Sequence, residues 1–239
     1  MRSITKQGEP QALIQWKAVN AATPQNLFYG GGGFPAEEVR RQLLWEQSHL
    51  CAYTLRRLQT AIDCQAVGKD TRASCHIEHI LPQSRNVAGE DIDYHNMVAC
   101  YPPSQSSVAC EYGAQAKADF DPSGGGFVSP LSPGVQAHFD FDERGDVSGL
   151  TPVGRSTICV LRLDHPTLVN DRAAVIKGFL QPRGKKLSAQ AARRLAQVVM
   201  QPDAQQRLPA YCVAVLCAAL KHAHREERRA ARMKKKGLQ

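Results

Sequence analysis

The stretch that decides the fold is CHIEHILPQS, residues 75–84, which is followed by YHNM, residues 94–97. Glu78 precedes His79 directly, and Pro82, a residue that ends strands, comes shortly after. Histidine titrates near neutral pH, and a carboxylate oxygen is a ligand that Mg²⁺ prefers. Metal-assisted hydrolysis of a phosphodiester needs a base to deprotonate water and a cation to stabilise charge on the leaving oxygen. The pattern therefore indicates His79 as the base and Glu78 as a metal ligand.

Asn96 completes this group. Its amide carries donors and an acceptor that can tie the returning chain to the loop bearing His79 and so hold the base in position. Neighbouring residues of a regular strand point to opposite faces, so Glu78 and His79 could address one metal only where the strand bends. We therefore predict a bend and an early strand end near Pro82.

Other polar residues around this group have less defined tasks. We expect His76 to position the site or to contact a phosphate, and Lys117 to contact a phosphate or to be a solvated helix lysine. Tyr94 and Tyr112 are predicted to pack rather than to stack on bases. Asp119 and Asp121 could supply a metal carboxylate, but the following PSGGG favours a turn.

These residues resemble the HNH endonucleases, whose ββα-metal finger carries a carboxylate–histidine pair on one strand, an asparagine after a loop and a third polar ligand on the helix. The chain is also similar to the PtuB-like effector nucleases of Septu and retron-linked anti-phage systems over roughly residues 1–180, through LLWEQSHLCAYT, HIEHILPQS, DYHNMVAC and CEYGAQAK. The resemblance implies a metal-dependent (Mg²⁺ or Mn²⁺) endonuclease with His79, Glu78 and Asn96 in its site. It also implies a nucleic-acid substrate, DNA or RNA with DNA favoured, and an ATPase partner in a defence complex.

The same resemblance places Gln115 in the helical region that bears the third metal ligand, although an amide binds cations more weakly than a carboxylate. Many family members carry Cys-x-x-Cys pairs, which are broken in this chain after Cys51 and after Cys100. A structural Zn²⁺ needs only four thiolate or imidazole ligands. We therefore keep open a zinc site made by Cys51, Cys100, Cys110 and either Cys75 or His95.

The composition fits a globular protein, with 43% hydrophobic and 22% charged residues in 239. No run approaches the ~18 apolar residues that span a membrane, and the opening residues lack the apolar stretch of a signal peptide. We therefore expect a cytoplasmic protein. In a reducing compartment, eight cysteines are unlikely to form a disulfide framework, so metal binding or burial is expected. Three of them lie in apolar runs and are predicted to be core residues: Cys159, Cys212 and Cys217.

The predicted fold is α+β: a central ββα-metal (HNH) finger with flanking helices, a small β-hairpin region and a helical C-terminus. We divide the chain into an N-terminal segment (1–33) ending in a Gly30–Gly33 hinge, a nuclease module (34–125) and an accessory strand and helical region with a basic tail (126–239). Local patterns predict a helix from Pro35, a hairpin across Glu143–Gly145, a buried strand at 156–163, helices capped by Asn170 and Ser188, and a long final helix.

The net charge of +8 suggests a polyanionic partner, but its distribution matters more than its size. Residues 221–239 hold eight cations against two glutamates, so they carry +6 of this charge. Such a tail is either a solvated helix end or an arm that binds phosphates or a partner. Because the metal and zinc ligand sets are incomplete, a second hypothesis stays open: a catalytically inactive, zinc-stabilised nucleic-acid-binding or adaptor protein.

Overall fold

The computed structural model describes residues 1–60, 63, 74–103 and 109–237. In this part of the chain the fold is mixed α+β, with seven α-helices, the last of them long, and two small two-stranded antiparallel sheets. The predicted α+β class and the helical C-terminus are thereby confirmed. Within the described ranges, no helix is both long and apolar enough to cross a membrane.

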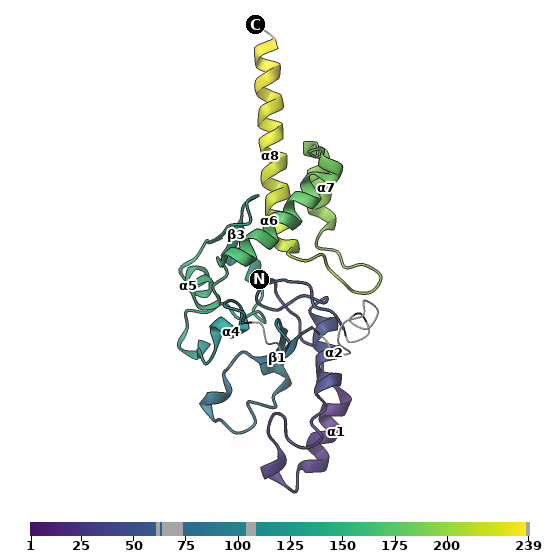
Figure 1. Ribbon diagram of the computed structural model, residues 1–239, viewed down its shortest axis with the longest axis vertical. Coiled ribbons are helices and arrows are strands. Elements are labelled where there is room, and N and C mark those ends of the chain that lie inside the picture. Colours follow the sequence, from purple (N-terminus) through teal and green to yellow (C-terminus); the bar gives the residue numbers. More distant parts are fainter. Residues whose placement is uncertain (61–62, 64–73, 104–108, 238–239) are drawn as a thin grey trace.

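The helices α1 (Gln11–Asn20) and α2 (Ala36–Glu46) lie at one end of the molecule (Figure 1). The helix predicted from Pro35 is confirmed as α2. Its first turn carries Glu37 and Glu38, whose charges are favourable at a helix N-terminus. Its inner face buries Val39 and Leu43 completely. Because this face packs against β2, α2 positions the sheet that follows.

The central sheet pairs β1 (His76–His79) with β2 (Met97–Cys100) in antiparallel register, His76 opposite Cys100 and His79 opposite Met97. All four residues of β2 are buried, whereas β1 alternates between half-buried and buried positions. The short helix α4 (Ala114–Lys117) follows in the chain. The predicted bend does not occur within β1, which stays regular and ends at His79.

A second sheet pairs β3 (Phe139–Phe141) with β4 (Val147–Gly149), which confirms the predicted hairpin. The strand predicted at 156–163 is wrong, because these residues belong largely to α5 (Pro152–Leu161). Thr151 caps this helix by accepting a hydrogen bond from the Gly154 N–H, and its buried positions recur at helical spacing: Gly154, Thr157, Ile158 and Leu161. An apolar run alone does not distinguish a buried strand from a buried helix face.

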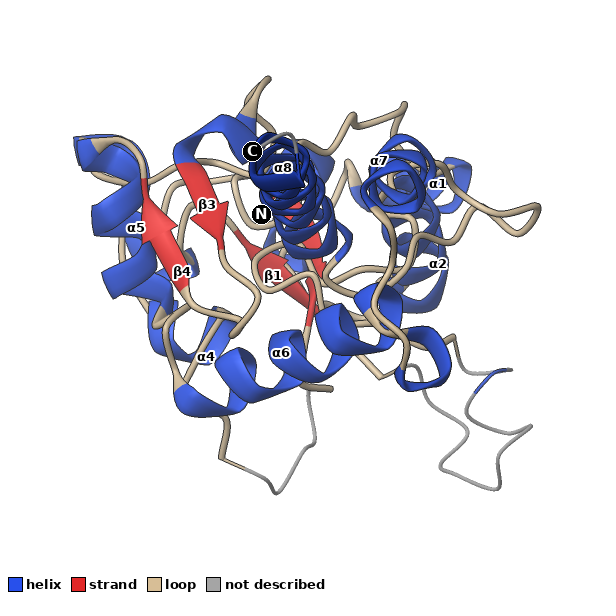
Figure 2. Cartoon of the chain, turned by 90° about the horizontal axis from the view of Figure 1, so that it is seen from above, coloured by secondary structure: helices blue, strands red, loops and turns tan. Residues whose placement is uncertain are grey.

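The last three helices are α6 (Pro166–Leu180), α7 (Ala189–Val198) and α8 (Cys212–Gly237). The prediction that Asn170 is an N-cap is wrong, because α6 begins earlier, after His165, whose side chain accepts from the Thr167 N–H. The cap at Ser188 is confirmed by its hydrogen bond from the Ala191 N–H. Figure 2 views α8 nearly end-on, with α7 beside it.

One hydrophobic core joins the three predicted segments, from Leu13 of α1 through Tyr53 and Met97 to Val215 of α8. Cys212 belongs to this core and Cys217 is half-buried. The prediction that Cys159 is a core residue is wrong: it is exposed, because it lies on the outer face of α5. Tyr94 and Tyr112 are buried, as predicted for packing residues.

Candidate functional site

His79 is the last residue of β1, and the loop that follows the strand holds its side chain. The His79 Nε2 atom lies 2.8 Å from the carbonyl oxygen of Asp91. A carbonyl can only accept, so Nε2 carries the proton and Nδ1 keeps a free lone pair in the neutral ring. Burial lowers the pKa of His79 below its ordinary 6.5, although the Asp91 carbonyl and the negative charge of Glu78 partly oppose this. The imidazole is therefore neutral and able to accept a proton at Nδ1 near neutral pH.

The glycine run before α2 lies next to this imidazole. The ring of Tyr29 meets the His79 ring edge to face, with 4.7 Å between the centroids, and the Tyr29 N–H donates to the Asp91 carboxylate at 2.7 Å. Trp16 Nε1 donates to the Gly32 carbonyl, and a Cβ on Gly31 would lie 2.5 Å from the Asn26 carbonyl oxygen. The run predicted as a hinge forms a turn in which Gly31 is buried and only glycine fits, and Tyr29, which precedes the run, packs against His79.

Asn96 braces the same loop from inside. Its Oδ1 accepts from the Leu81 N–H at 2.7 Å, and its Nδ2 donates to the carbonyls of Leu81 and Glu90. Its own carbonyl accepts from the Ile80 N–H. Leu81 follows the end of β1, and Glu90 precedes Asp91, which holds the imidazole. The structure therefore places Asn96 where it joins both ends of the loop, the position expected from the sequence.

Glu78 lies on the opposite face of β1, in a cluster with two cationic or titratable groups. Its carboxylate is 3.1 Å from the ammonium of Lys117 and 3.5 Å from His76 Nε2. Burial alone would lower the pKa of His76, but hydrogen bonds to Glu78 and to the Pro102 carbonyl raise it instead. Burial and the charge of Glu78 raise the pKa of Tyr53 well above its ordinary value. Glu78 is thus a partly buried carboxylate that is compensated by neighbouring cations.

Two residues predicted to contact substrate have other partners. Lys117 is 2% exposed, and its ammonium donates to the His79 carbonyl at 2.9 Å as well as pairing with Glu78. It therefore ties α4 to the end of β1 instead of reaching a phosphate, and the solvated-lysine alternative is also wrong. His76 is held between Glu78 and the Pro102 carbonyl, which fits the positioning role of the two that we considered.

The predicted metal ligands are not gathered in one place. No group of three or more His, Cys, Asp or Glu side chains within the described residues could hold a metal ion. Gln115, the expected third ligand, is exposed and its Oε1 accepts from the Cys110 N–H at 2.7 Å. Asp121 pairs with Arg85 at 2.6 Å and accepts from the Ser123 N–H, so it forms the turn that PSGGG favoured. Glu78 remains the carboxylate closest to His79 in the sequence, and its negative charge acts on the imidazole.

The predicted zinc set is not assembled either. Cys51 and Cys100 are fully buried and hydrogen-bonded to each other. Burial opposes ionisation of Cys51, but bonds from Cys100, Thr54 and the Tyr101 N–H lower its pKa to about 6. Three further candidates do not complete four ligands around this pair: Cys75, Cys110, whose thiol lies 3.4 Å from the Tyr112 carbonyl oxygen, and the exposed His95. Within the described chain, the geometry gives the zinc prediction no support.

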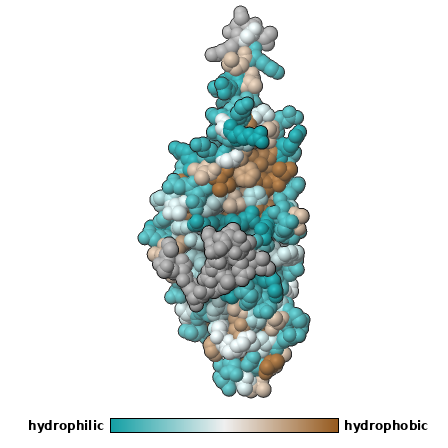
Figure 3. Space-filling view, turned by 45° about the vertical axis from the view of Figure 1, so that its right-hand side comes forward, coloured by the Kyte–Doolittle hydropathy of each residue, from teal (hydrophilic) through white to brown (hydrophobic). Residues whose placement is uncertain are grey.

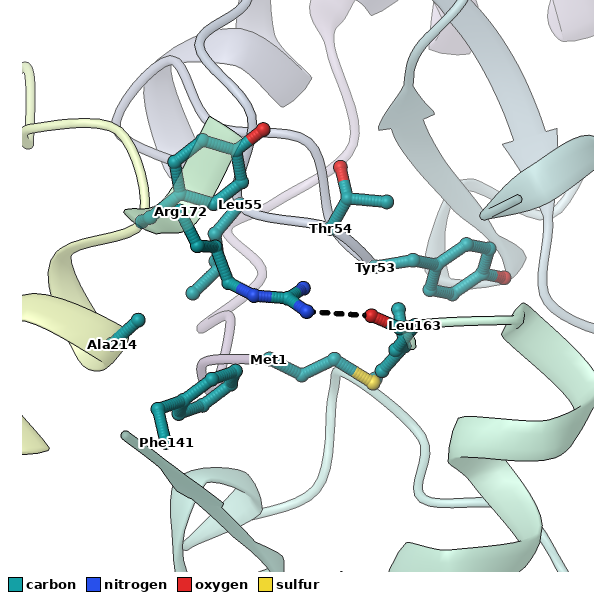
Figure 4. A pocket seen from close by; sticks show the side chains of 9 residues that line it. Met1, Tyr53, Thr54, Leu55, Phe141, Leu163, Arg172 and Ala214 are labelled. Carbon is teal, nitrogen blue, oxygen red and sulfur yellow. Dashed lines mark hydrogen bonds between the residues drawn. The ribbon is translucent and has the colours of Figure 1, made fainter. Parts of the chain in front are cut away.

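A small cavity lies away from this site, between the hairpin, α6 and the start of α8 (Figure 4). Arg172 crosses it and donates to the carbonyls of Leu163 and Gly145, while Tyr53 points its hydroxyl away from it. Its volume of about 10 Å³ holds roughly one water molecule. The cavity is a packing feature and is too small for a substrate.

Two of the residues that shape the site, Tyr29 and Asp91, were missed from the sequence. Asp91 acts through its backbone carbonyl, which no side-chain pattern reveals. Tyr29 directly precedes the glycine run, and the available signal was this run, because glycine lets the backbone approach a neighbour closely. Comparison with models of known protein families and with curated proteins found no match to this chain.

Proposed function

We propose that this protein is a metal-dependent endonuclease of the HNH type, with His79 as general base. The observation that carries the proposal is the hydrogen bond from His79 Nε2 to the Asp91 carbonyl, which leaves Nδ1 free to take a proton. A neutral, oriented imidazole contributes about 10²–10⁴-fold to a hydrolysis rate. The order of β1, β2 and α4, with Asn96 bracing the loop between the strands, supports a ββα-metal finger.

In this mechanism His79 Nδ1 accepts the proton of the attacking water while Asp91 holds the other nitrogen. The free energy that orients the ring comes from three sources: the Asp91 carbonyl, the Tyr29 ring and the loop braced by Asn96. Because Glu78 and His79 leave β1 on opposite faces at its very end, we place the scissile phosphate across the end of the strand. His79 is buried and Glu78 is half-buried, so bulk water has limited access to both side chains.

Glu78 is the residue that could hold a divalent cation. In sites that act on phosphates, Mg²⁺ is commonly held by one or two carboxylates, with waters and phosphate oxygens completing the coordination. A single carboxylate is therefore enough for a site completed by substrate, and the partly exposed Glu78 provides it. A bound Mg²⁺ or Mn²⁺ supplies Lewis-acid stabilisation of the phosphate and the leaving oxygen. Because Lys117 already compensates the charge of Glu78, a divalent cation held there would also need the negative charge of a bound phosphate.

The test is cleavage of supercoiled plasmid DNA by the purified protein in titrations of Mg²⁺ and Mn²⁺. We expect His79→Ala to lose at least about 10²-fold in rate while keeping the wild-type circular dichroism spectrum. His95→Ala is the matched control, because it removes an exposed imidazole from the same loop. The proposal fails if His79→Ala and His95→Ala cleave at the wild-type rate, or if the wild type is equally active with EDTA.

One observation favours a second candidate, a nucleic-acid-binding protein without catalysis. The ammonium of Lys117 takes the place beside Glu78 where a cation would be needed. If this ion pair persists with substrate bound, Glu78 holds no metal, and the protein binds nucleic acid without cutting it. Binding of plasmid, single-stranded DNA and tRNA without cleavage in any metal would support this second candidate.

The family resemblance further proposes an ATPase partner and a role in anti-phage defence. Its support is the sequence likeness alone. Co-purification of a large ATPase with the full chain, and cleavage that appears only in that complex, would establish this partner. Cleavage by the chain alone, unchanged by adding the partner, would contradict it.

A further inference from the structure

The C-terminal half of α8 extends beyond the body of the molecule. Figure 1 shows α8 projecting along the long axis, away from β1 and the candidate site, and Figure 3 shows its projecting end as mainly hydrophilic, with apolar surface gathered near its root. Residues 228–235 are exposed without exception. At 1.5 Å per residue, these eight exposed residues make about 12 Å of helix. A helix exposed on all sides gains nothing from packing, so this part is available to a partner.

The cations at the root of α8 are neutralised, whereas those at its free end are not, except Arg229, which lies 3.9 Å from Glu226. Lys221 pairs with Asp140 at 2.6 Å and Arg225 with Glu143 at 2.5 Å, both on the β3–β4 hairpin. Glu227 is paired with Arg193 of α7. No acidic residue follows Glu227 in the sequence. The free end therefore carries uncompensated positive charge.

Five cations of α8, from its root to its free end, lie on one face of the helix. Lys221, Arg225, Arg228, Arg232 and Lys235 recur at alternating spacings of four and three residues, which places them in one stripe. An open groove of about 770 Å³ follows part of this face and is lined by four stripe residues and three neighbours: Lys221, Arg225, Arg228, Arg232, His224, Arg229 and Met233.

Most residues between the stripe positions are not cations; the exceptions are Arg229, which borders the stripe, and Lys234. Glu226, Glu227, Ala230 and Ala231 fall on the other faces of the helix, and so does Lys234. A helix end that was basic only for solubility would not need its cations on one side. The one-sided arrangement indicates a surface that meets a linear polyanion.

We propose that residues 228–235 of α8 bind the phosphate backbone of double-stranded DNA, independently of sequence. The identity of the polymer as DNA rests on the proposed function, whereas its negative charge is inferred from the stripe alone. Duplex DNA carries one negative charge per about 1.7 Å of axis, so the stripe meets a phosphate wherever it lies along the duplex. A free-standing helix about 10–12 Å wide also fits the major groove of B-form DNA, about 12 Å wide, whereas the deep, narrow groove of A-form RNA excludes it.

Because the arm projects away from β1, it binds DNA far from the cleaved bond and raises affinity without selecting the site of cleavage. Lysine and arginine contacts to phosphates release counterions, so each contact contributes about −0.9 to the slope of log K against log salt. Four contacts, made by Arg228, Arg229, Arg232 and Lys235, would contribute about −3.6.

The experiment measures fluorescence anisotropy of a labelled DNA duplex with the full chain carrying His79→Ala, so that cleavage does not interfere. In this background we change Arg228, Arg229, Arg232 and Lys235 together to Gln, which keeps helix propensity. We expect weaker binding at low salt and a slope that is less negative by about 3–4. Two controls should leave the slope nearly unchanged: Lys234→Gln on another face of α8, and the four exposed cations Arg183, Lys185, Lys186 and Arg194 changed together to Gln.

The proposal is overturned if the arm variant binds DNA with the wild-type slope, which would leave the arm to an acidic protein partner. It is also overturned if the four-cation control loses as much as the arm variant, or if an RNA duplex of the same sequence depends equally on the arm. Because the readout is binding, a wild-type chain that never cleaves DNA contradicts the nuclease but not the arm. A chain that cleaves DNA with an unchanged slope in the arm variant contradicts the arm but not the nuclease.

Discussion

Two charged regions of this molecule, the cluster around Glu78 and the arm of α8, differ in how their charges are held. In the cluster, Lys117 is 2% exposed and lies 3.1 Å from the Glu78 carboxylate. In the arm, the cations are exposed and most have no acidic neighbour. Charges in a buried environment interact strongly and shift pKa values, whereas exposed charges are screened by solvent and salt. The first arrangement suits chemistry at one atom, and the second suits many weak contacts with a polymer.

The largest contrast is expected from removing one carboxylate in each region. Glu78→Gln leaves the buried Lys117 ammonium without its counter-charge, which costs about 3–5 kcal/mol of unfolding free energy. Glu227→Gln breaks an exposed pair with Arg193 and should leave that free energy unchanged within error. Urea denaturation measures both.

A double variant separates stability from activity at this position. Replacing the pair by Glu78→Gln with Lys117→Met should recover much of the lost stability, because an apolar side chain needs no counter-charge. Plasmid cleavage should stay absent in both variants. Cleavage by the stable double variant at the wild-type rate would remove Glu78 from the mechanism.

The next effect concerns the loop that orients His79. Asn96→Ala removes three buried hydrogen bonds and should lower the unfolding free energy by about 2–4 kcal/mol. Asn26→Ala removes a single exposed bond and serves as the control. Below the melting range, Asn96→Ala should also cleave more slowly, because the Asp91 carbonyl is no longer fixed. A variant that is destabilised but fully active would make Asn96 structural only.

A smaller effect is expected at Tyr29. The edge-to-face contact with His79 is worth about 0.5–1.5 kcal/mol, so Tyr29→Ala should slow cleavage by roughly tenfold or less. Tyr29→Phe keeps the ring and should retain the wild-type rate. Equal slowing by both variants would assign the effect to the hydroxyl instead of the ring.

The smallest effect is the dependence of stability on pH. The pKa of His76 is raised by folding, so its stabilisation is complete below its ordinary 6.5 and is lost as pH rises through the folded value. The pKa of His79 is lowered, so its contribution is complete above 6.5 and is lost as pH falls through the folded value. Relative to the wild type, His76→Ala should therefore shift the optimum of stability to higher pH, and His79→Ala should shift it to lower pH. Denaturation midpoints across the pH range test these opposite signs.

Local chemistry made part of this structure predictable. Glu37 and Glu38 marked the start of α2, and Ser188 marked the cap of α7, because each acts through neighbours in the chain. The apolar run around Ile158 was misassigned because its burial depends on tertiary packing, which periodicity over a few residues does not reveal.

The candidate site was also predictable only in part from the sequence. His79, Glu78 and Asn96 were predicted as site residues because their chemistry follows from residue type and spacing, and their roles stay predictions. Two features join distant parts of the chain: the burial of Lys117 and the contact of Tyr29 with His79. No local sequence pattern predicts such contacts. The predicted zinc site lacks support for a related reason. Cysteine spacing gives the number of candidate ligands but not the distances between them in the folded chain.

The proposed mechanism requires that His79 is a neutral base with its proton on Nε2. Long-range ¹H–¹⁵N correlation NMR of the full chain, with His79 assigned by comparison with His79→Ala, measures this directly. The account predicts the Nε2–H tautomer at neutral pH, with Nδ1 unprotonated and a titration midpoint below the ordinary 6.5. A proton on Nδ1, or a doubly protonated ring at neutral pH, would contradict it.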